Sequence, residues 1–215
     1  MSEQTWVLVR GLVREQRHWE QFPAQLAASL PANSRVLCID LPGNGLHWQQ
    51  ASPRSVAGMV DAARQDLAAQ GVTGPVSLLA LSLGAMTAFE WMSRYPQDIE
   101  RAVLLNTSLS ALSPFWQRLR PQNYLRILHD VLVHRAPVHR ERMILEISTN
   151  LVADREFYVR RWTGYALERP VSIANALRQL LAAARYRAPA QPPRCRASGS
   201  DACPGVLRSS FRAVP

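Results

Sequence analysis

The sequence predicts an α/β fold, a mostly parallel sheet with helices on both faces. Two observations support this prediction. Short runs rich in valine, leucine and isoleucine recur along the first half of the chain, and single segments with helical spacing of apolar residues separate them. Strands joined by single helices form right-handed βαβ units, which bury both faces of the sheet. The chain has 215 residues, enough to build such a sheet around a sizeable core.

Strand and helix patterns alternate from the N-terminus to residue 106. Four short runs are expected to be strands: TWVLV (5–9), RVLCID (35–40), PVSLLA (75–80) and RAVLLN (101–106). Segments 19–30, about 52–70 and about 83–95 are expected to be the helices between them. In the second helix the apolar residues recur at helical spacing, at Val56, Met59, Val60, Ala63 and Leu67. Gly71 follows and is expected to end this helix.

The alternation stops after residue 107, and the pattern up to residue 169 is wholly helical, which predicts an inserted helical cap. An amphipathic helix follows, with Ile173, Leu177, Leu180, Leu181 and Ala184 on one face. The predicted divisions are an N-terminal core part (1–107), the cap (108–169), a core helix (170–186) and an aberrant or disordered tail (187–215).

The tail is unusual because it holds many prolines and arginines and one acidic residue. Arg194 and Arg196 stand where a central strand would need apolar residues, and neighbouring prolines interrupt strand pairing. One explanation is a genuine disordered or poorly docked tail. The other is a frameshift or truncation in a GC-rich gene, which replaced the original C-terminal region. The sequence leaves both explanations open.

Composition excludes several classes of partner. Every one of the 25 basic residues is arginine and the net charge is +9, but the arginines are scattered and no nucleic-acid-binding motif accompanies them. We therefore expect no nucleic-acid partner, and a basic nucleic-acid-binding module is the weakest alternative. Cys38, Cys195 and Cys203 lack the spacing of a disulfide framework or a zinc site. The longest uncharged run, 67–89, contains glycine, proline and hydroxyl residues, so we expect a cytoplasmic protein without integral membrane association.

The segment LLALSLGAMTAFEW (78–91) sets Ser82 where a strand must turn sharply into a helix. A nucleophile on such a turn has a strained backbone, and the residues two before and two after it must be small. Ala80 and Gly84 meet this requirement. The pattern A-x-S-x-G keeps the steric logic of the more usual G-x-S-x-G and predicts a nucleophile elbow.

Two further motifs accompany the elbow in order. Arg10-Gly11-Leu12 ends the first strand, and DLPGNG (40–45) ends the second. Together with the elbow they resemble the H-G-x turn and the D-x-P-G-x-G loop of the α/β-hydrolase superfamily, and the predicted helical insertion resembles its cap. The resemblance covers about 5–187. It implies an α/β-hydrolase fold with a helical cap and a serine esterase or lipase-like activity.

The resemblance also implies roles for single residues. Ser82 is the nucleophile, and the backbone N–H groups of Leu12 and Leu83 form the oxyanion hole. Gly11, like Ala80 and Gly84, supports the elbow and its neighbouring loop. Arg10 replaces the family's usual histidine, and either holds the loop through a carboxylate such as that of Asp40 or binds an anionic part of the substrate. Asp40 itself is expected to organise its loop.

The family order is serine, acid, histidine, and Asp201 in the tail is the candidate acid. No histidine follows His139, and the five histidines of the chain (His18, His47, His129, His134 and His139) do not stand where the family places its base. Because the catalytic histidine is missing, we expect the hydrolytic activity of this chain to be impaired. The implied reaction is hydrolysis of a small ester or acyl substrate through an acyl-serine, with no metal or organic cofactor. The alternatives are a catalytically inactive hydrolase-fold binding protein, a truncated gene product, or acyl transfer, perhydrolysis or C–C hydrolysis on the same scaffold. The oligomeric state stays open.

Overall fold

The computed structural model describes residues 4–105, 136–148 and 154–189 of the chain. In this part, parallel strands form one sheet in the order β2-β1-β3-β4. The strands are β1 (Gln4–Val9), β2 (Ser34–Ile39), β3 (Val76–Leu81) and β4 (Ile99–Leu105). The four predicted runs are therefore all strands, and the prediction of a parallel sheet is confirmed.

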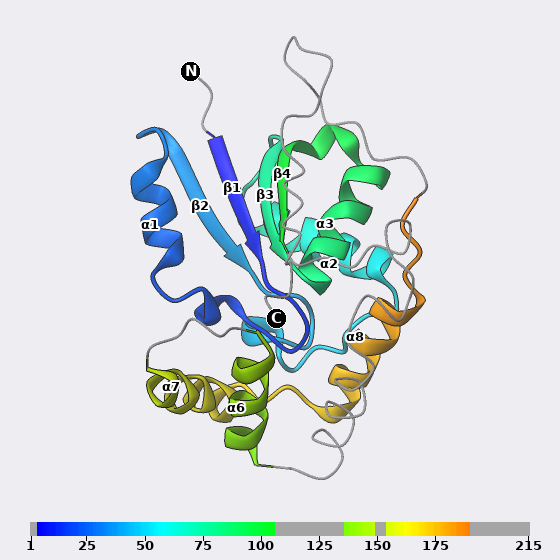
Figure 1. Cartoon of the computed structure of the whole chain (residues 1–215). Helices are drawn as coiled ribbons and strands as arrows, with labels where there is room; N and C mark the ends of the chain where they lie inside the picture. Colours follow the sequence, from blue (N-terminus) through cyan, green and yellow to red (C-terminus); the bar gives the residue numbers. More distant parts are fainter. Residues whose placement is uncertain (1–3, 106–135, 149–153, 190–215) are drawn as a thin grey trace, which may run out of the picture.

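Helices cover both faces of this sheet, as predicted (Figure 1). The α-helices are α1 (Phe22–Ser29), α2 (Val56–Ala69), α3 (Leu83–Arg94), α6 (Pro137–Ser148), α7 (Arg155–Glu168) and α8 (Ile173–Arg185). Short 3-10 helices are η1 (Gln16–Trp19), η2 (Gly45–His47) and η3 (Pro96–Asp98). Helix α1 lies on one side of the sheet and α2 and α3 on the other, while α6, α7 and α8 lie beyond the carboxyl ends of the strands (Figure 1).

Alternation along β1 divides its side chains between two cores. Val7 and Val9 belong to the larger core, which the sheet forms with α2 and α3. Trp6 and Leu8 belong to the smaller core, in which Trp19 and partly buried residues of α1 cover the other face. The carboxyl end of β1 therefore lies between two packed layers, and residues that follow it are held firmly.

The second predicted helix is confirmed in its C-terminal end and in its buried face, but it begins at Val56 rather than near residue 52. Ser55 caps α2 by accepting the backbone N–H of Gly58 at 3.2 Å, and Gly71 follows the helix with φ +75°, a conformation that glycine adopts without strain. All five predicted apolar residues of its stripe are buried. The predicted start of the first helix is wrong. Trp19 ends η1, and Glu20 has a non-helical backbone with φ 52°, so α1 begins only at Phe22.

Helix α8 forms where it is predicted but does not bury its apolar face. Ile173 is 50% exposed and Leu177 is 42% exposed, whereas the polar residues Asn175 and Gln179 are buried. This is a correction to the expectation from the helical pattern. The physical reason is that two loops next to Ser82 offer backbone and side-chain hydrogen-bonding groups to the polar face of α8, described below.

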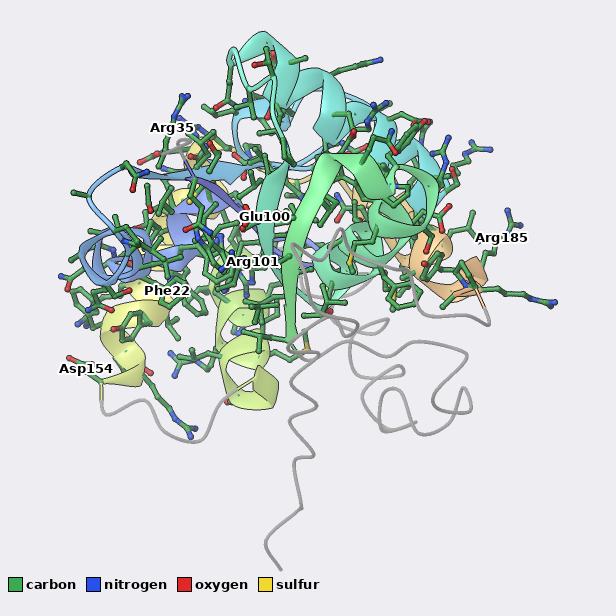
Figure 2. The ribbon with its side chains drawn as sticks, turned by 90° about the horizontal axis from the view of Figure 1, so that it is seen from above. Phe22, Arg35, Glu100, Arg101, Asp154 and Arg185 are labelled. Carbon is green, nitrogen blue, oxygen red and sulfur yellow. The ribbon has the colours of Figure 1, made fainter. Side chains whose placement is uncertain are left out.

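The described part of the predicted cap is helical, and α6 and α7 contact each other. Asp154, which Figure 2 labels, caps α7 by accepting the backbone N–H of Phe157 at 2.9 Å. The domain boundaries at 107, 169 and 186 stay predictions, and residues 106–135 and 190–215 lie outside the described residues. None of the described helices is both long and apolar enough to cross a membrane.

Candidate active site

Ser82 stands between β3 and α3 in a strained backbone conformation. Its φ is 54° and its ψ is −116°, and its side chain is exposed. A non-glycine residue at positive φ costs about 1–3 kcal/mol and persists only where its surroundings hold it. Here the backbone N–H of Ser82 donates to the carbonyl oxygen of Leu105 at 3.1 Å, and its carbonyl accepts from Met86 at 3.1 Å. Strand β4 and helix α3 thus hold the strained turn from both sides.

The small residues around Ser82 are required by close backbone contacts. A Cβ atom at Gly84 would lie 2.5 Å from the carbonyl oxygen of Arg10 and 2.6 Å from that of Val9. A Cβ atom at Gly11 would lie 2.9 Å from the Cβ atom of Ser82. Ala80 is fully buried in the larger core. The end of β1 therefore packs directly against the turn that carries Ser82.

Two backbone N–H groups are available next to this turn. Leu83 is the first residue of α3, so its N–H has no acceptor within the helix and lies at the positive end of the helix dipole. Leu12 follows Gly11 in the turn that touches Ser82. This turn is fixed because Gly11 accepts the N–H of Arg14 at 3.2 Å and Val13, at φ 55°, donates its N–H to another element.

That element is α8, and the acceptor is the side chain of Gln179. Its Oε1 atom accepts the N–H of Val13 at 2.9 Å, and its Nε2 atom donates to Asn44 Oδ1 at 2.9 Å and to Ser52 Oγ at 3.0 Å. One turn earlier, Asn175 accepts the N–H of Ser52 at 2.9 Å. A buried amide network thus joins α8 to the loops that follow β1 and β2. Sequence reasoning missed Asn175 and Gln179; their i, i+4 spacing on one face was the available signal.

Asp40 organises the loop after β2, as the sequence predicts. Its carboxylate accepts the backbone N–H groups of Gln16 at 2.7 Å and Leu46 at 2.9 Å, and also the side-chain amide of Gln16. It does not bond to Arg10 in the described structure, so the suggested Arg10–Asp40 contact is wrong. The carboxylate thus connects the loop after β1 to the loop after β2.

The guanidinium of Arg10 lies instead 4.7 Å from the centre of the Trp19 ring. Its Nε atom is buried without a hydrogen-bond partner among the described residues. Burial lowers the pKa of Arg10 to about 10, and the nearby charge of Arg14 adds to this effect. Arg10 remains a cation at neutral pH, and no described carboxylate is paired with it.

Arg14, in contrast, forms a buried ion pair. Its Nη1 atom donates to Glu141 of α6, and both side chains are almost fully buried. The same Nη1 atom lies 2.9 Å from His18 Nε2, which therefore accepts, and His18 Nδ1 lies 3.2 Å from the carbonyl oxygen of Glu15. Burial, followed by the charges of Arg14 and Arg10, lowers the pKa of His18 from 6.5 to about 2. His18 is thus a neutral structural residue that links the first loop to α6.

No described histidine is hydrogen-bonded to Ser82. Both ring nitrogens of His18 have other partners, and those of His47 face Gln50 at 3.0 Å and Asp66 at 3.4 Å. His139, at the start of α6, is exposed, and its backbone N–H donates to Ala136. His129, His134 and the candidate acid Asp201 lie outside the described residues. The described residues thus include a candidate nucleophile and two candidate oxyanion donors, and no described histidine is bonded to that serine.

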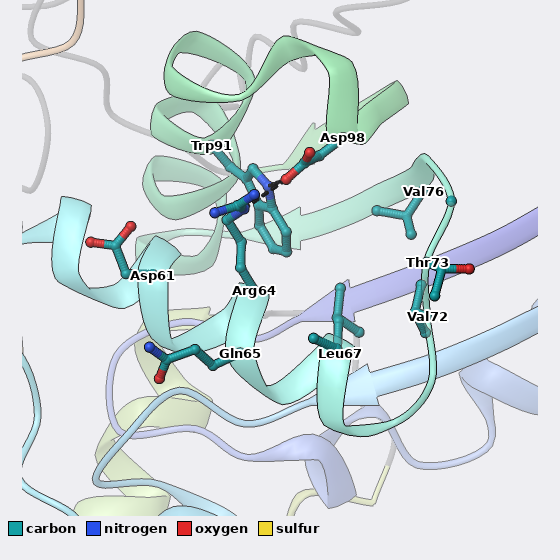
Figure 3. A pocket seen from close by; sticks show the side chains of 11 residues that line it. Asp61, Arg64, Gln65, Leu67, Val72, Thr73, Val76, Trp91 and Asp98 are labelled. Carbon is teal, nitrogen blue, oxygen red and sulfur yellow. Dashed lines mark hydrogen bonds and ion pairs between the residues drawn. The ribbon is translucent and has the colours of Figure 1, made fainter.

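One cavity of the described structure is not lined by Ser82. It has a volume of about 490 Å³ and lies between α2, α3 and the amino end of β3 (Figure 3). In this cavity Asp98 accepts from Arg64 at 2.7 Å and from the indole of Trp91 at 3.1 Å, so these polar groups of the cavity wall are already paired with one another. A second cavity of about 310 Å³ lies beside Trp19 and α7. The described side chains contain no group of three acidic, histidine or cysteine residues that could hold a metal ion.

Solved structures share this fold. A carboxylesterase of the thaumarchaeon Nitrososphaera gargenis superposes with a TM-score of 0.61 at 16% identity over 87% of this chain. A hydrolase of Pseudomonas aeruginosa gives 0.60 at 23% identity over 86%, and an esterase of Thermogutta terrifontis gives 0.59 at 19% identity over 86%. The chain spans 65% of each of these three proteins. At such identities the likeness shows the fold.

A search among curated proteins finds no match. A family model described as "Alpha/beta hydrolase family" matches residues 6–211, nearly the whole chain. This match includes the elbow, the turn after β1 and the loop after β2, the motifs from which the resemblance was inferred. The chain therefore belongs to the alpha/beta hydrolase family.

Proposed function

We propose that the protein is a serine hydrolase that cleaves small carboxylic esters through an acyl-enzyme at Ser82. The observation that carries this proposal is the strained, exposed Ser82 at the start of α3, against which Gly11 and Gly84 pack without side chains. Such a turn costs stability, and strained residues of this kind cluster at active sites. The esterases among the structures of the same fold favour an ester as the substrate class.

In the proposed reaction the Ser82 hydroxyl attacks the ester carbonyl carbon and gives up its proton. The N–H groups of Leu12 and Leu83 hold the oxyanion, and each such donor typically lowers the barrier by about 3 kcal/mol. The alcohol leaves with the proton, and water then attacks the acyl-serine to release the carboxylic acid. The general base that takes the proton from Ser82 is a residue other than His18 or His47. Asp201 remains the proposed acid of the triad.

A second candidate is a hydrolase-fold binding protein without catalytic activity. The observation that favours it is the lack of a hydrogen bond between Ser82 and any described histidine, since an unassisted serine hydroxyl is a weak nucleophile at neutral pH. Acyl transfer, perhydrolysis and C–C hydrolysis would use the same nucleophile. A cytoplasmic location, the lack of a nucleic-acid partner and the helical cap at 108–169 also stay predictions.

Hydrolysis of p-nitrophenyl butyrate by three forms of the protein separates these candidates. The wild type and Ser29→Ala, which changes an exposed serine of α1, should release p-nitrophenol at equal rates. Ser82→Ala should reduce the rate to that of buffer. Binding of the ester without turnover in all three forms would instead support the binding protein, and equal turnover in all three would remove Ser82 from the mechanism.

A further inference from the structure

Arg10 is the charged residue nearest along the chain to the contact between β1 and Ser82. It directly precedes Gly11, and its carbonyl oxygen packs on Gly84 of the elbow. The central carbon of its guanidinium lies over the Trp19 ring, 4.7 Å from the ring centre, and Phe22 stacks on Trp19 with ring centres 5.5 Å apart. This aromatic support fixes the guanidinium, which a purely solvated arginine would not need.

The charge of Arg10 is not balanced by the described residues around it. Arg14 is neutralised by Glu141, and His18 is neutral. Glu20, the nearby acid, already accepts from the indole of Trp162 at 2.9 Å and pairs with Arg161 at 2.8 Å. Arg140 also contacts Glu141, at 3.4 Å, so this group of side chains keeps a net positive charge, and the guanidinium of Arg10 has no paired carboxylate among the described residues.

Donor atoms are also left over. The Nε atom of Arg10 and the Nη2 atom of Arg14 are both buried without a hydrogen-bond partner among the described residues. Arg14 is only 7% exposed, so its free donor faces the protein interior rather than bulk water. Buried donors without acceptors cost about 1–3 kcal/mol each, a cost that an anion hydrogen-bonded to them would remove.

We infer that Arg10 binds a carboxylate carried by the acyl part of the substrate, with Arg14 as a second donor. The substrate class is then half-esters of short dicarboxylic acids. A carboxylate complements the unpaired positive charge of Arg10, and a planar guanidinium presents paired N–H donors to a carboxylate. This inference rests on the proposed function, because the bound molecule is a substrate only if the protein hydrolyses esters. Binding of a carboxylate at Arg10 does not itself require catalysis.

The test therefore measures binding where no turnover occurs. Monomethyl glutarate and its neutral analogue, methyl 5-amino-5-oxopentanoate, are titrated calorimetrically into Ser82→Ala. The acid should bind at least about tenfold more tightly than the amide, since a charged hydrogen bond contributes about 1.5–3 kcal/mol. Arg10→Gln in the same background should abolish the preference. Arg10→Lys should reduce it, because the charge stays and the fork of donors is lost.

Arg35 provides the matched control. It is an exposed arginine in β2, labelled in Figure 2, and Arg35→Gln should leave the preference unchanged. Equal binding of acid and amide to Ser82→Ala would overturn the inference, as would an undiminished preference for the acid in a folded Arg10→Gln protein. Carboxylate binding without ester hydrolysis by the wild type would overturn the proposed function and leave the carboxylate site standing. Hydrolysis without acid preference would do the reverse.

Discussion

Gln179 of α8 accepts the backbone N–H of Val13 at 2.9 Å, although 166 positions separate the two residues. Val13 directly follows Leu12, whose N–H is a proposed oxyanion donor, and Val13 has a positive φ of 55° that needs support. The side chain of Gln179 is completely buried and also bonds to the loop after β2. A helix late in the chain thus sets the backbone next to Ser82.

Gln179→Ala should therefore weaken both the fold and the site. It leaves the N–H of Val13 and the side chain of Asn44 without their partner, and each unsatisfied buried group costs about 1–3 kcal/mol. Urea unfolding should show this loss, and ester hydrolysis should fall. Leu177→Gln is the control on the exposed face of the same helix and should change neither property. Equal effects of the two variants would mean that α8 acts only through general packing.

Gly84→Ala should disrupt the elbow through a single methyl group. The added Cβ atom would lie 2.5 Å from a backbone carbonyl oxygen, so β1 and α3 must separate. We expect a loss of about 1–3 kcal/mol in unfolding free energy, together with loss of reactivity at Ser82. Gly74→Ala adds the same methyl group where nothing lies within 4 Å, and its unfolding curve should match the wild type. A stable, reactive Gly84→Ala protein would show that the close contact is not required.

Stability should fall in mild acid because of His18. Its pKa is about 2 in the folded protein and close to 6.5 in the unfolded chain, so the unfolded chain binds the extra proton between these values. The contribution is complete above pH 6.5 and is lost as the pH falls, by about 2 kcal/mol between pH 7 and pH 5. Burial raises the pKa of Glu15, so Glu15 makes the stability change with pH in the opposite direction. This effect is present in the wild type and in His18→Gln alike, so a comparison of the two isolates His18. Urea unfolding of wild type and His18→Gln at both pH values checks this. If His18→Gln lost as much unfolding free energy between pH 7 and pH 5 as the wild type, the prediction would be contradicted.

Glu141→Gln should destabilise the contact between the first loop and α6. Arg14 and Glu141 are both almost fully buried, and removing one partner of such a pair typically costs about 3–5 kcal/mol. Thermal unfolding measures the effect. Glu156→Gln removes one partner of an exposed pair with Arg142, which joins α7 to α6, and should leave the midpoint unchanged. If both variants unfold alike, the burial of the Arg14 pair does not contribute to stability.

The sequence predicts what depends on local pattern. The four strands, the stripe of α2 from Val56 to Leu67 and the elbow around Ser82 all follow from the spacing of apolar and small residues, which a single segment reveals. The same holds for Asp40, since an aspartate before a glycine-rich loop commonly accepts its backbone N–H groups.

The sequence does not reveal which residues far apart in the chain contact each other in the folded protein. Apolar spacing in α8 points to the face with Ile173 and Leu177, yet its polar face is buried, because hydrogen bonds to two distant loops hold it there. A carboxylate such as that of Asp40 is a more usual partner for an arginine than an indole ring is. Asp40 nevertheless accepts backbone N–H groups, and Arg10 lies over the ring of Trp19. Such choices depend on competition between contacts far apart in the chain, which no local pattern encodes.

Reaction with a fluorophosphonate tests the central claim most directly, because the reagent forms a stable adduct only with an activated serine. Peptide mapping by mass spectrometry after labelling should locate the phosphonyl group on Ser82 alone, and Ser82→Ala should remain unlabelled while Ser29→Ala labels like the wild type. An adduct on another residue, or wild-type protein that stays unlabelled while it hydrolyses esters, would contradict the assignment of Ser82 as the nucleophile.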